Sequence, residues 1–129
     1  MKISAPISVG ELIDKITILR IKLEKIADPA QLANIRAEHD HLAQIHEQNR
    51  IATLIDGKDE EILQSVNREL WEVEDRLREH EAREDFGTEF VALARSVYRL
   101  NDRRAAAKRS LNLRSGSLIV EEKSYKGPG

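Results

Sequence analysis

Apolar residues recur along much of the chain at alternating steps of three and four, the spacing of one face of an α-helix. The pattern is weaker in residues 29–55, which lie between the first and second strongly patterned segments. Here Ile35, Leu42 and Ile45 alternate with Glu38 and His39. The pattern predicts four helices, of which the second is peripheral or meets a polar partner. The three strong lines are Leu12, Ile16, Leu19, Leu23 and Ile26; Leu63, Val66, Leu70, Val73 and Leu77; and Phe90, Leu93, Val97, Leu100, Ala107 and Leu111.

Capping signals place the ends of these helices. Ser8 and Glu11 have the spacing of a capping box, and Ile13, Ile18 and Ile21 widen the apolar surface of the first helix, which indicates a central position. The remaining boundaries are a start at Asp28-Pro29, an end of that helix near Ile55 before Asp56-Gly57, a third helix capped by Asp59, a fourth from Gly87 or Thr88, and a stop at Gly116.

Helices of about 25 residues would be about 38 Å long, more than a compact domain of this size needs. We therefore predict an all-α fold, an elongated antiparallel four-helix bundle or coiled-coil-like hairpins, quite naturally completed by a second copy. Residues 1–129 are expected to form a single helical domain in which residues 117–129 are an extended or flexible tail.

Composition narrows the class of protein. The 129 residues include no cysteine, which excludes disulfides, thiolate metal sites and a cysteine nucleophile. The N-terminus lacks the apolar core of a secretory signal, and no stretch approaches the roughly 18 apolar residues of a membrane span. The expectation is a cytoplasmic protein without a membrane span.

Charge is unevenly distributed along the chain. Residues 56–89 hold thirteen acids and five bases, whereas residues 95–114 hold seven bases and one acid. At helical spacing the basic segment divides into two lines. The arginine stripe is Arg95, Arg99 and Arg103, and the mixed stripe is Tyr98, Asn101, Ala105, Lys108 and Asn112.

The mixed stripe combines cationic donors, amides and a small residue, which suit a carboxylate, a phosphate or sugar hydroxyls. The alternative is structural: the arginines pair with the acidic third helix, and Lys108 and Arg109 favour the negative end of their own helix. The predicted binding surface comprises Tyr98, Arg99, Asn101, Arg103, Arg104, Lys108 and Asn112, with Lys15 and Lys22 of the first helix.

Other chemistry finds less support. Glu38 and His41 have the E-x-x-H spacing of carboxylate-bridged metal bundles, but no second such motif occurs, so solvent-facing or interface histidines are favoured over a metal site. No glycine-rich phosphate loop or hydroxyl–histidine pair is evident, and no cofactor or metal is expected. An acidic protein whose basic segment holds one aromatic residue, Tyr98, lacks the stacking platform of single-strand binders, which argues against nucleic acid.

Three segments carry a family resemblance: ISAPISVGELIDKITILRIK, ELWEVEDRLREHEA, and FVALARSVYRLNDRRAAAKRSLN followed by LIVEEKSY. Together they resemble a family of small uncharacterised bacterial helical proteins. The resemblance implies no known activity, and it implies a context of glycosyltransferase and tetratricopeptide-repeat proteins of surface-polysaccharide loci.

The stretch ELIDKITILRIKLEKI is also similar to the all-helical chorismate mutases, which bind a dicarboxylate through arginines and a lysine. That resemblance implies a small helical enzyme and a concave cationic pocket faced by a carboxylate such as Glu11 or Glu121. The first helix here stops at Pro29, sooner than in that class. The sequence favours a non-enzymatic binding or scaffolding module that forms a homo-oligomer and holds a protein partner or a small anionic ligand.

Overall fold

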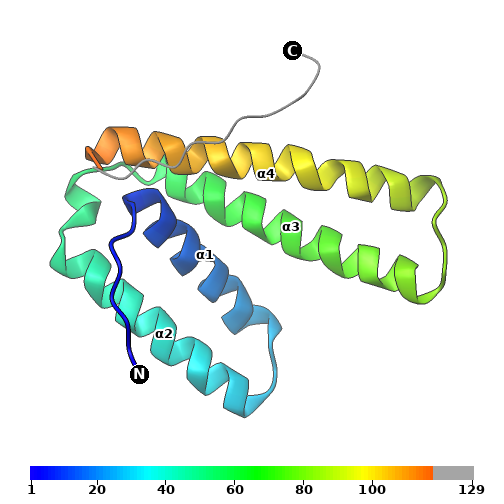
Figure 1. The fold of residues 1–129 in the computed structure, drawn as a ribbon, viewed down its shortest axis with the longest axis horizontal. Coiled ribbons are helices and arrows are strands. Elements are labelled where there is room, and N and C mark those ends of the chain that lie inside the picture. Colours follow the sequence, from blue (N-terminus) through cyan, green and yellow to red (C-terminus); the bar gives the residue numbers. More distant parts are fainter. Residues whose placement is uncertain (118–129) are drawn as a thin grey trace.

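The computed structural model describes residues 1–117, which contain four α-helices, one short 3₁₀ turn and no strand (Figure 1). The all-α prediction is therefore confirmed, and the predicted tail lies outside the described residues apart from its first residue. The elements are α1 Val9–Lys25, α2 Pro29–Gln48, η1 Ile51–Thr53, α3 Lys58–Ala82 and α4 Thr88–Ser115.

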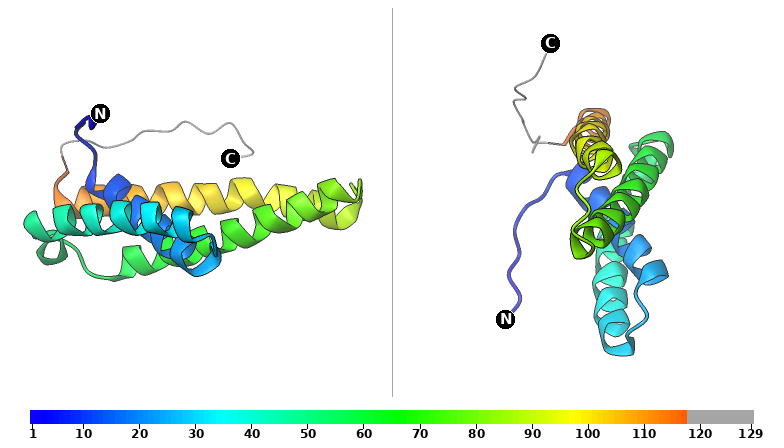
Figure 2. Two further views of the ribbon diagram at one scale, coloured as in Figure 1. Left: turned by 90° about the horizontal axis from the view of Figure 1, so that it is seen from below. Right: turned by 90° about the vertical axis from the view of Figure 1, so that its right-hand side faces the viewer.

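The helices form two antiparallel hairpins that meet through α1. In Figure 1, α1 lies between α2 on one side and the α3–α4 pair on the other. Figure 2 shows that the far halves of α3 and α4 continue beyond α1 as a two-helix arm. The hairpin form of the predicted architecture thus describes the molecule best, and the central position of α1 is confirmed.

Burial follows this arrangement. Leu12, Ile13 and Ile16 of α1 form the main core with Leu63 of α3 and Leu111 of α4. A smaller cluster of Val66, Leu70 and Leu100 continues the core between α3 and α4. By contrast, α2 contributes no buried residue, as its weak apolar line predicted. It lies on α1 as a covering helix.

The predicted start of the first helix and the predicted end of the last helix are both confirmed. The Ser8 hydroxyl accepts a hydrogen bond from the Glu11 backbone N–H at 3.1 Å and begins α1. Gly116 adopts a left-handed conformation with φ of 68°, and its backbone N–H donates hydrogen bonds to carbonyl groups in the last turn of α4.

Two predicted boundaries are wrong. The second helix ends at Gln48 because Asn49 bonds back to the Ile45 carbonyl and Arg50 turns left-handed with φ of 52°, so that the chain can bury Ile51 in the core. The third helix begins at Lys58, whose backbone N–H donates a hydrogen bond to the Asp56 side chain. Asp59 is not its cap, since this side chain lies in the first turn and bonds to α4.

Within residues 1–117, no helix combines the length and the apolar character needed to cross a membrane.

Candidate functional site

Six cations of α4 differ in their contacts: three contact acidic side chains, and three have no ion pair within residues 1–117. Arg104, Lys108 and Arg114 contact acidic side chains of the two hairpins. Arg95, Arg99 and Arg103, the arginine stripe, are exposed. The distinction determines which predicted site residues are available to a ligand.

Arg104 occupies the gap in the apolar line of α4 because it pairs with a buried acid of α1. Its Nε and Nη2 atoms lie 2.9 and 2.5 Å from the two carboxylate oxygens of Asp14, whose side chain is 1% exposed. Asn67 of α3 donates from Nδ2 to Asp14 and to the hydroxyl of Thr17, both at 2.9 Å. This network joins α1, α3 and α4, and a fork-to-fork pair of this kind fixes orientation as well as distance.

A second contact between α1 and α4 lies one turn away. Lys108 Nζ is 2.6 Å from Glu11 Oε2, and the Gly10 backbone N–H donates to Asn112 Oδ1 at 2.7 Å. A Cβ atom at Gly10 would stand 2.5 Å from the Lys108 carbonyl oxygen, so only glycine permits this approach. Asn112 is 1% exposed, and its Nδ2 atom has no hydrogen-bond partner within the described chain.

The end of α4 is tied to α3. Ser110 Oγ donates to Asp59 Oδ2 at 2.8 Å, and the Arg114 guanidinium lies 3.2 Å from both Asp59 and Asp56. Thus α4 pairs with acids of both neighbours, but Arg104 and Lys108 are neutralised by α1 and not by α3.

Three of the predicted site residues on α4 are exposed: Tyr98, Arg99 and Arg103. Tyr98 is 54% exposed, and the Arg99 guanidinium lies 5.7 Å from the centre of its ring, a cation–π distance. Arg103 is also exposed. In residues 1–117 the structure gives Arg95, Arg99 and Arg103 no ion pair.

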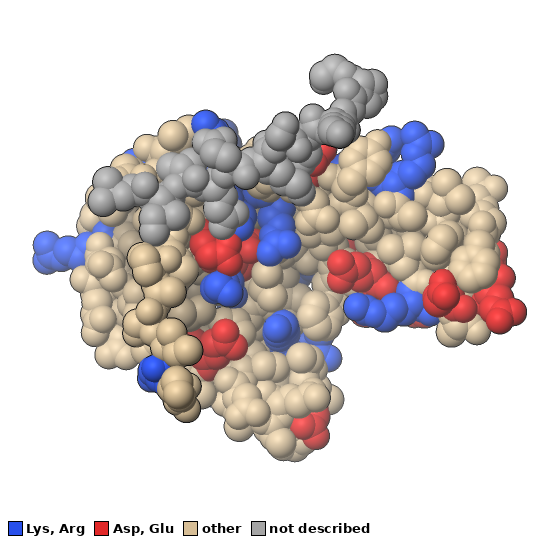
Figure 3. All heavy atoms as spheres, in the orientation of Figure 1, with Lys and Arg blue, Asp and Glu red and all other residues tan. Residues whose placement is uncertain are grey.

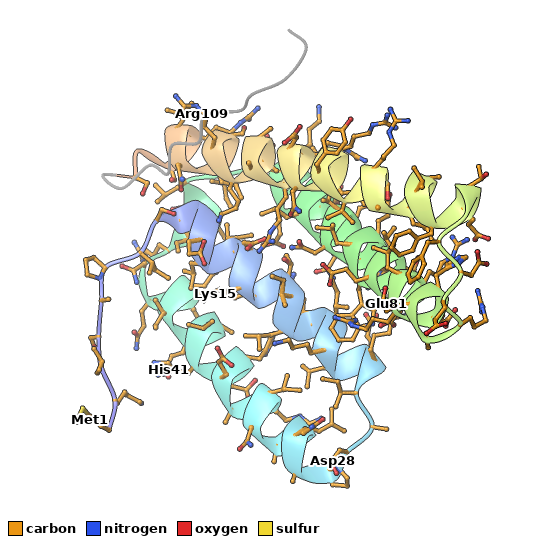
Figure 4. The ribbon with its side chains drawn as sticks, turned by 45° about the vertical axis from the view of Figure 1, so that its right-hand side comes forward. Met1, Lys15, Asp28, His41, Glu81 and Arg109 are labelled. Atoms are coloured by element: carbon orange, nitrogen blue, oxygen red, sulfur yellow. The ribbon has the colours of Figure 1, made fainter. Side chains whose placement is uncertain are left out.

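The remaining predicted residues are Lys15 and Lys22 of α1 and Asn101 of α4. Lys15 is exposed on α1 (Figure 4), and its Nζ atom is 3.7 Å from Glu11 Oε1, so Lys15 and Lys108 share one carboxylate. Asn101 and Lys22 are half-buried, and Lys22 is two turns further along α1 than Lys15. The structure therefore brings Lys15, Lys108 and Asn112 together around the start of α1, and separates them from Arg99 and Arg103.

The cations facing α1 do not form an uncompensated cationic pocket. On the face seen in Figure 3, Lys and Arg atoms lie beside Asp and Glu atoms near the centre, where α1 meets α4. Glu11 does face Lys108, as the enzyme alternative expects, but the two groups are in direct contact. A shallow recess of about 330 Å³ lies on α3, and its lining includes the acids Glu61, Glu69 and Glu72.

Three of the four histidines lie on α2 and the fourth lies on α3. His41 points away from α1 on the exposed side of α2 (Figure 4). His80, which the sequence did not single out, is 4% exposed at the tip of the α3–α4 hairpin, within 3.4 Å of Asp85 and 3.7 Å of Glu89. Across residues 1–117, no set of three His, Asp or Glu side chains is placed to hold a metal ion.

Sequence reasoning missed the α1 side of the contact, namely Gly10, Asp14 and Thr17, together with Asn67 of α3. One signal could have found Asp14. An arginine at a core position of α4 requires a buried acid nearby, and Asp14 is an acid flanked by the apolar line of α1. Gly10 is a point of close approach between α1 and α4, and its spacing in the sequence carries no sign of this.

Comparison with known proteins gives a family and no activity. No curated protein matches the chain. No solved structure matches it either. A model of a family of unknown function, DUF6165, matches residues 1–129. The chain, with its two helical hairpins joined through α1, therefore belongs to the family of unknown function DUF6165.

Proposed function

We propose that this chain is a binding or scaffolding module without chemistry of its own, and that the arginine stripe of α4 holds an acidic surface of a protein partner. The observation that carries the proposal is the contrast within one helix. Arg104, Lys108 and Arg114 are in contact with acids, while Arg95, Arg99 and Arg103 are exposed with no ion pair in the described part of the chain.

A protein partner suits this surface better than a small ligand. Three arginines spaced four residues apart extend over about 12 Å of helix, which matches a row of carboxylates on another helix. Tyr98 beside Arg99 adds an exposed aromatic ring, and aromatic residues and arginine are enriched at protein interfaces.

The proposed contact surface contains fewer residues than the binding surface predicted from the sequence. Arg104, Lys108 and Asn112 hold α1 on α4, so their role is to keep the helix in place. Tyr98, Arg99 and Arg103, joined by Arg95, form the contact surface, and Lys15, Lys22 and Asn101 lie outside it. A partner from a surface-polysaccharide context belongs to the proposal through the resemblance noted in the sequence, and a cytoplasmic location belongs to it through the absence of cysteine and of a secretory signal in the sequence.

The test uses fluorescent poly-L-glutamate as an acidic probe. We expect the wild-type protein to bind it with an affinity that falls as salt is added, and the R99E/R103E variant to bind at least tenfold more weakly. Arg36→Glu on α2 is the matched control, because Arg36 is exposed and distant in sequence from the stripe. Equal binding by wild type and R99E/R103E overturns the proposal, and tighter binding of single-stranded DNA than of poly-L-glutamate replaces it with a nucleic-acid function.

A further inference from the structure

The α3–α4 hairpin has one side that no described helix covers. Asn67 and Arg104 both point at Asp14, which defines the side that carries α1. At about 100° per residue, Glu69 is turned about 200° from Asn67, and Arg99 is turned about 140° from Arg104. Figure 2 shows α1 and α2 on one side of the α3–α4 pair. We call the opposite side the back face, and its central residues are Ile62, Glu69, Val73, Arg99 and Arg103.

The back face has the composition of an interface. Ile62 and Val73 are half-buried residues that pack against the α3–α4 core cluster, Ile62 also packs against the main core, and both remain partly open to solvent. Glu69 lies between them in sequence and is exposed. Neither Glu69 nor the two arginines has an ion pair within residues 1–117. Arg76, which lies on the same side of α3, is already paired with Glu89 of α4.

The register of the hairpin places these charges at the same height. The Ser110–Asp59 hydrogen bond and the contact of His80 with Glu89 fix α3 and α4 antiparallel. Ten residues along α3 from Asp59 is Glu69, and ten residues back along α4 from Ser110 is Leu100. Glu69 is therefore level with the segment between Arg99 and Arg103.

We propose that the back face is the interface for a second copy of this chain, in which Glu69 of each copy lies between Arg99 and Arg103 of the other. The proposal rests on the proposed function, because it names the acidic surface that the arginines of α4 hold. A twofold axis parallel to the hairpin turns one back face onto the other and sets α3 of each copy against α4 of its partner.

In this symmetric dimer the contact between Glu69 and the two arginines occurs twice, and in each case it joins opposite charges. Because Glu69 and the two arginines are level, the rotation brings each Glu69 to the height of the partner's arginine pair without any shift along the axis. Ile62 and Val73 then lie at the centre of a four-helix arrangement made of two hairpins, which removes their remaining surface from water. An isologous contact of this kind closes on itself and stops at two copies.

The experiment measures molar mass in solution by light scattering and by sedimentation. At low salt we expect the wild-type chain to have twice its mass of 14.7 kDa, with a growing monomer fraction as salt or poly-L-glutamate is added. Glu69→Arg and R99E/R103E are each expected to shift the protein to the monomer, since each places like charges opposite one another. Circular dichroism checks that every variant stays helical.

The decisive variant combines both changes in one chain. E69R/R99E/R103E restores opposite charges across the interface with their signs exchanged, and we expect it to regain the dimer. Arg36→Glu is the control and stays dimeric. A monomeric wild type, a dimer that survives in R99E/R103E, or a triple variant that stays monomeric while folded overturns the inference.

The two proposals fail separately. If the wild type is monomeric but R99E/R103E loses poly-L-glutamate binding, the second copy is not the partner and the acidic-partner function stands. If the dimer forms and the probe neither binds nor dissociates it, the back face is an interface between copies and the arginine stripe has no wider binding role.

Discussion

The buried carboxylate of Asp14 is the residue on which the joint between the hairpins depends. Its side chain is 1% exposed, and it receives donors from Arg104 and Asn67. The Arg104 side chain is 32% exposed, so the cation keeps access to water while the anion does not. The two partners of this ion pair are therefore not equivalent.

This asymmetry predicts unequal costs of removing each partner. Arg104→Met leaves a buried carboxylate without its counter-charge, and we expect it to lower the free energy of unfolding by about 3 to 5 kcal/mol. Asp14→Asn leaves an arginine that can turn to solvent, and the expected cost is about 1 to 3 kcal/mol. Urea unfolding followed by circular dichroism measures both values.

The double variant D14L/R104M gives the control for that comparison. Because it removes both charges and fills the site with apolar atoms, we expect it to be more stable than R104M alone. Equal costs for the two single variants, or a double variant less stable than R104M, would contradict the assigned burial of Asp14.

At the scale of the helices, α1 approaches α4 closely at Gly10. We expect Gly10→Ala to destabilise the protein by about 1 to 3 kcal/mol, because the new methyl group overlaps the Lys108 backbone carbonyl and cannot be accommodated by a side-chain rotation. Thermal unfolding of the variant measures this loss.

Gly57→Ala is the matched comparison for that substitution. Gly57 has a φ of −77° and nothing within 4 Å of an added Cβ, so its change should alter stability by less than about 1 kcal/mol. If the two alanine variants are equally stable, the close approach of α1 to α4 is wrong.

The helices themselves were largely predictable from sequence because their signals are local. The caps at Ser8 and Gly116 and the apolar lines of α1, α3 and α4 need only neighbours within a turn or two. The early end of α2 was not predictable, since Ile51 leaves the helix to reach a core formed by distant residues.

The candidate site was predictable only in part for the same reason. Spacing on α4 separates the arginine stripe from the mixed stripe, but it does not show which stripe meets another helix. The partners of Arg104 and Lys108 are 90 and 97 residues away in the sequence, and their identity depends on how the hairpins are joined. Within the described residues, these cations contact Asp14 and Glu11 of α1, although α3 carries many more acids.

The whole molecule is an open pair of hairpins, and this shape can be measured directly. A compact chain of 129 residues has an expected radius of gyration of about 14 Å. The α4 helix alone is about 42 Å long, and the α3–α4 arm extends past α1. We therefore expect small-angle scattering to give a clearly larger radius of gyration, measured on the R99E/R103E variant because that variant is expected to be monomeric. A radius near that of a compact sphere would contradict the extended arm.

The contact between α1 and α4 also sets the order in which the chain can acquire its structure. During synthesis α1 emerges before α4, so the buried Asp14 has no cation to meet until Arg104, 90 residues further along the chain, has also emerged. The helix available at once is α2, whose contacts with α1 are local and are the fastest to form. A covering helix with no buried residue thus shields the apolar side of α1 in the nascent chain, before the second hairpin is there to receive the opposite side.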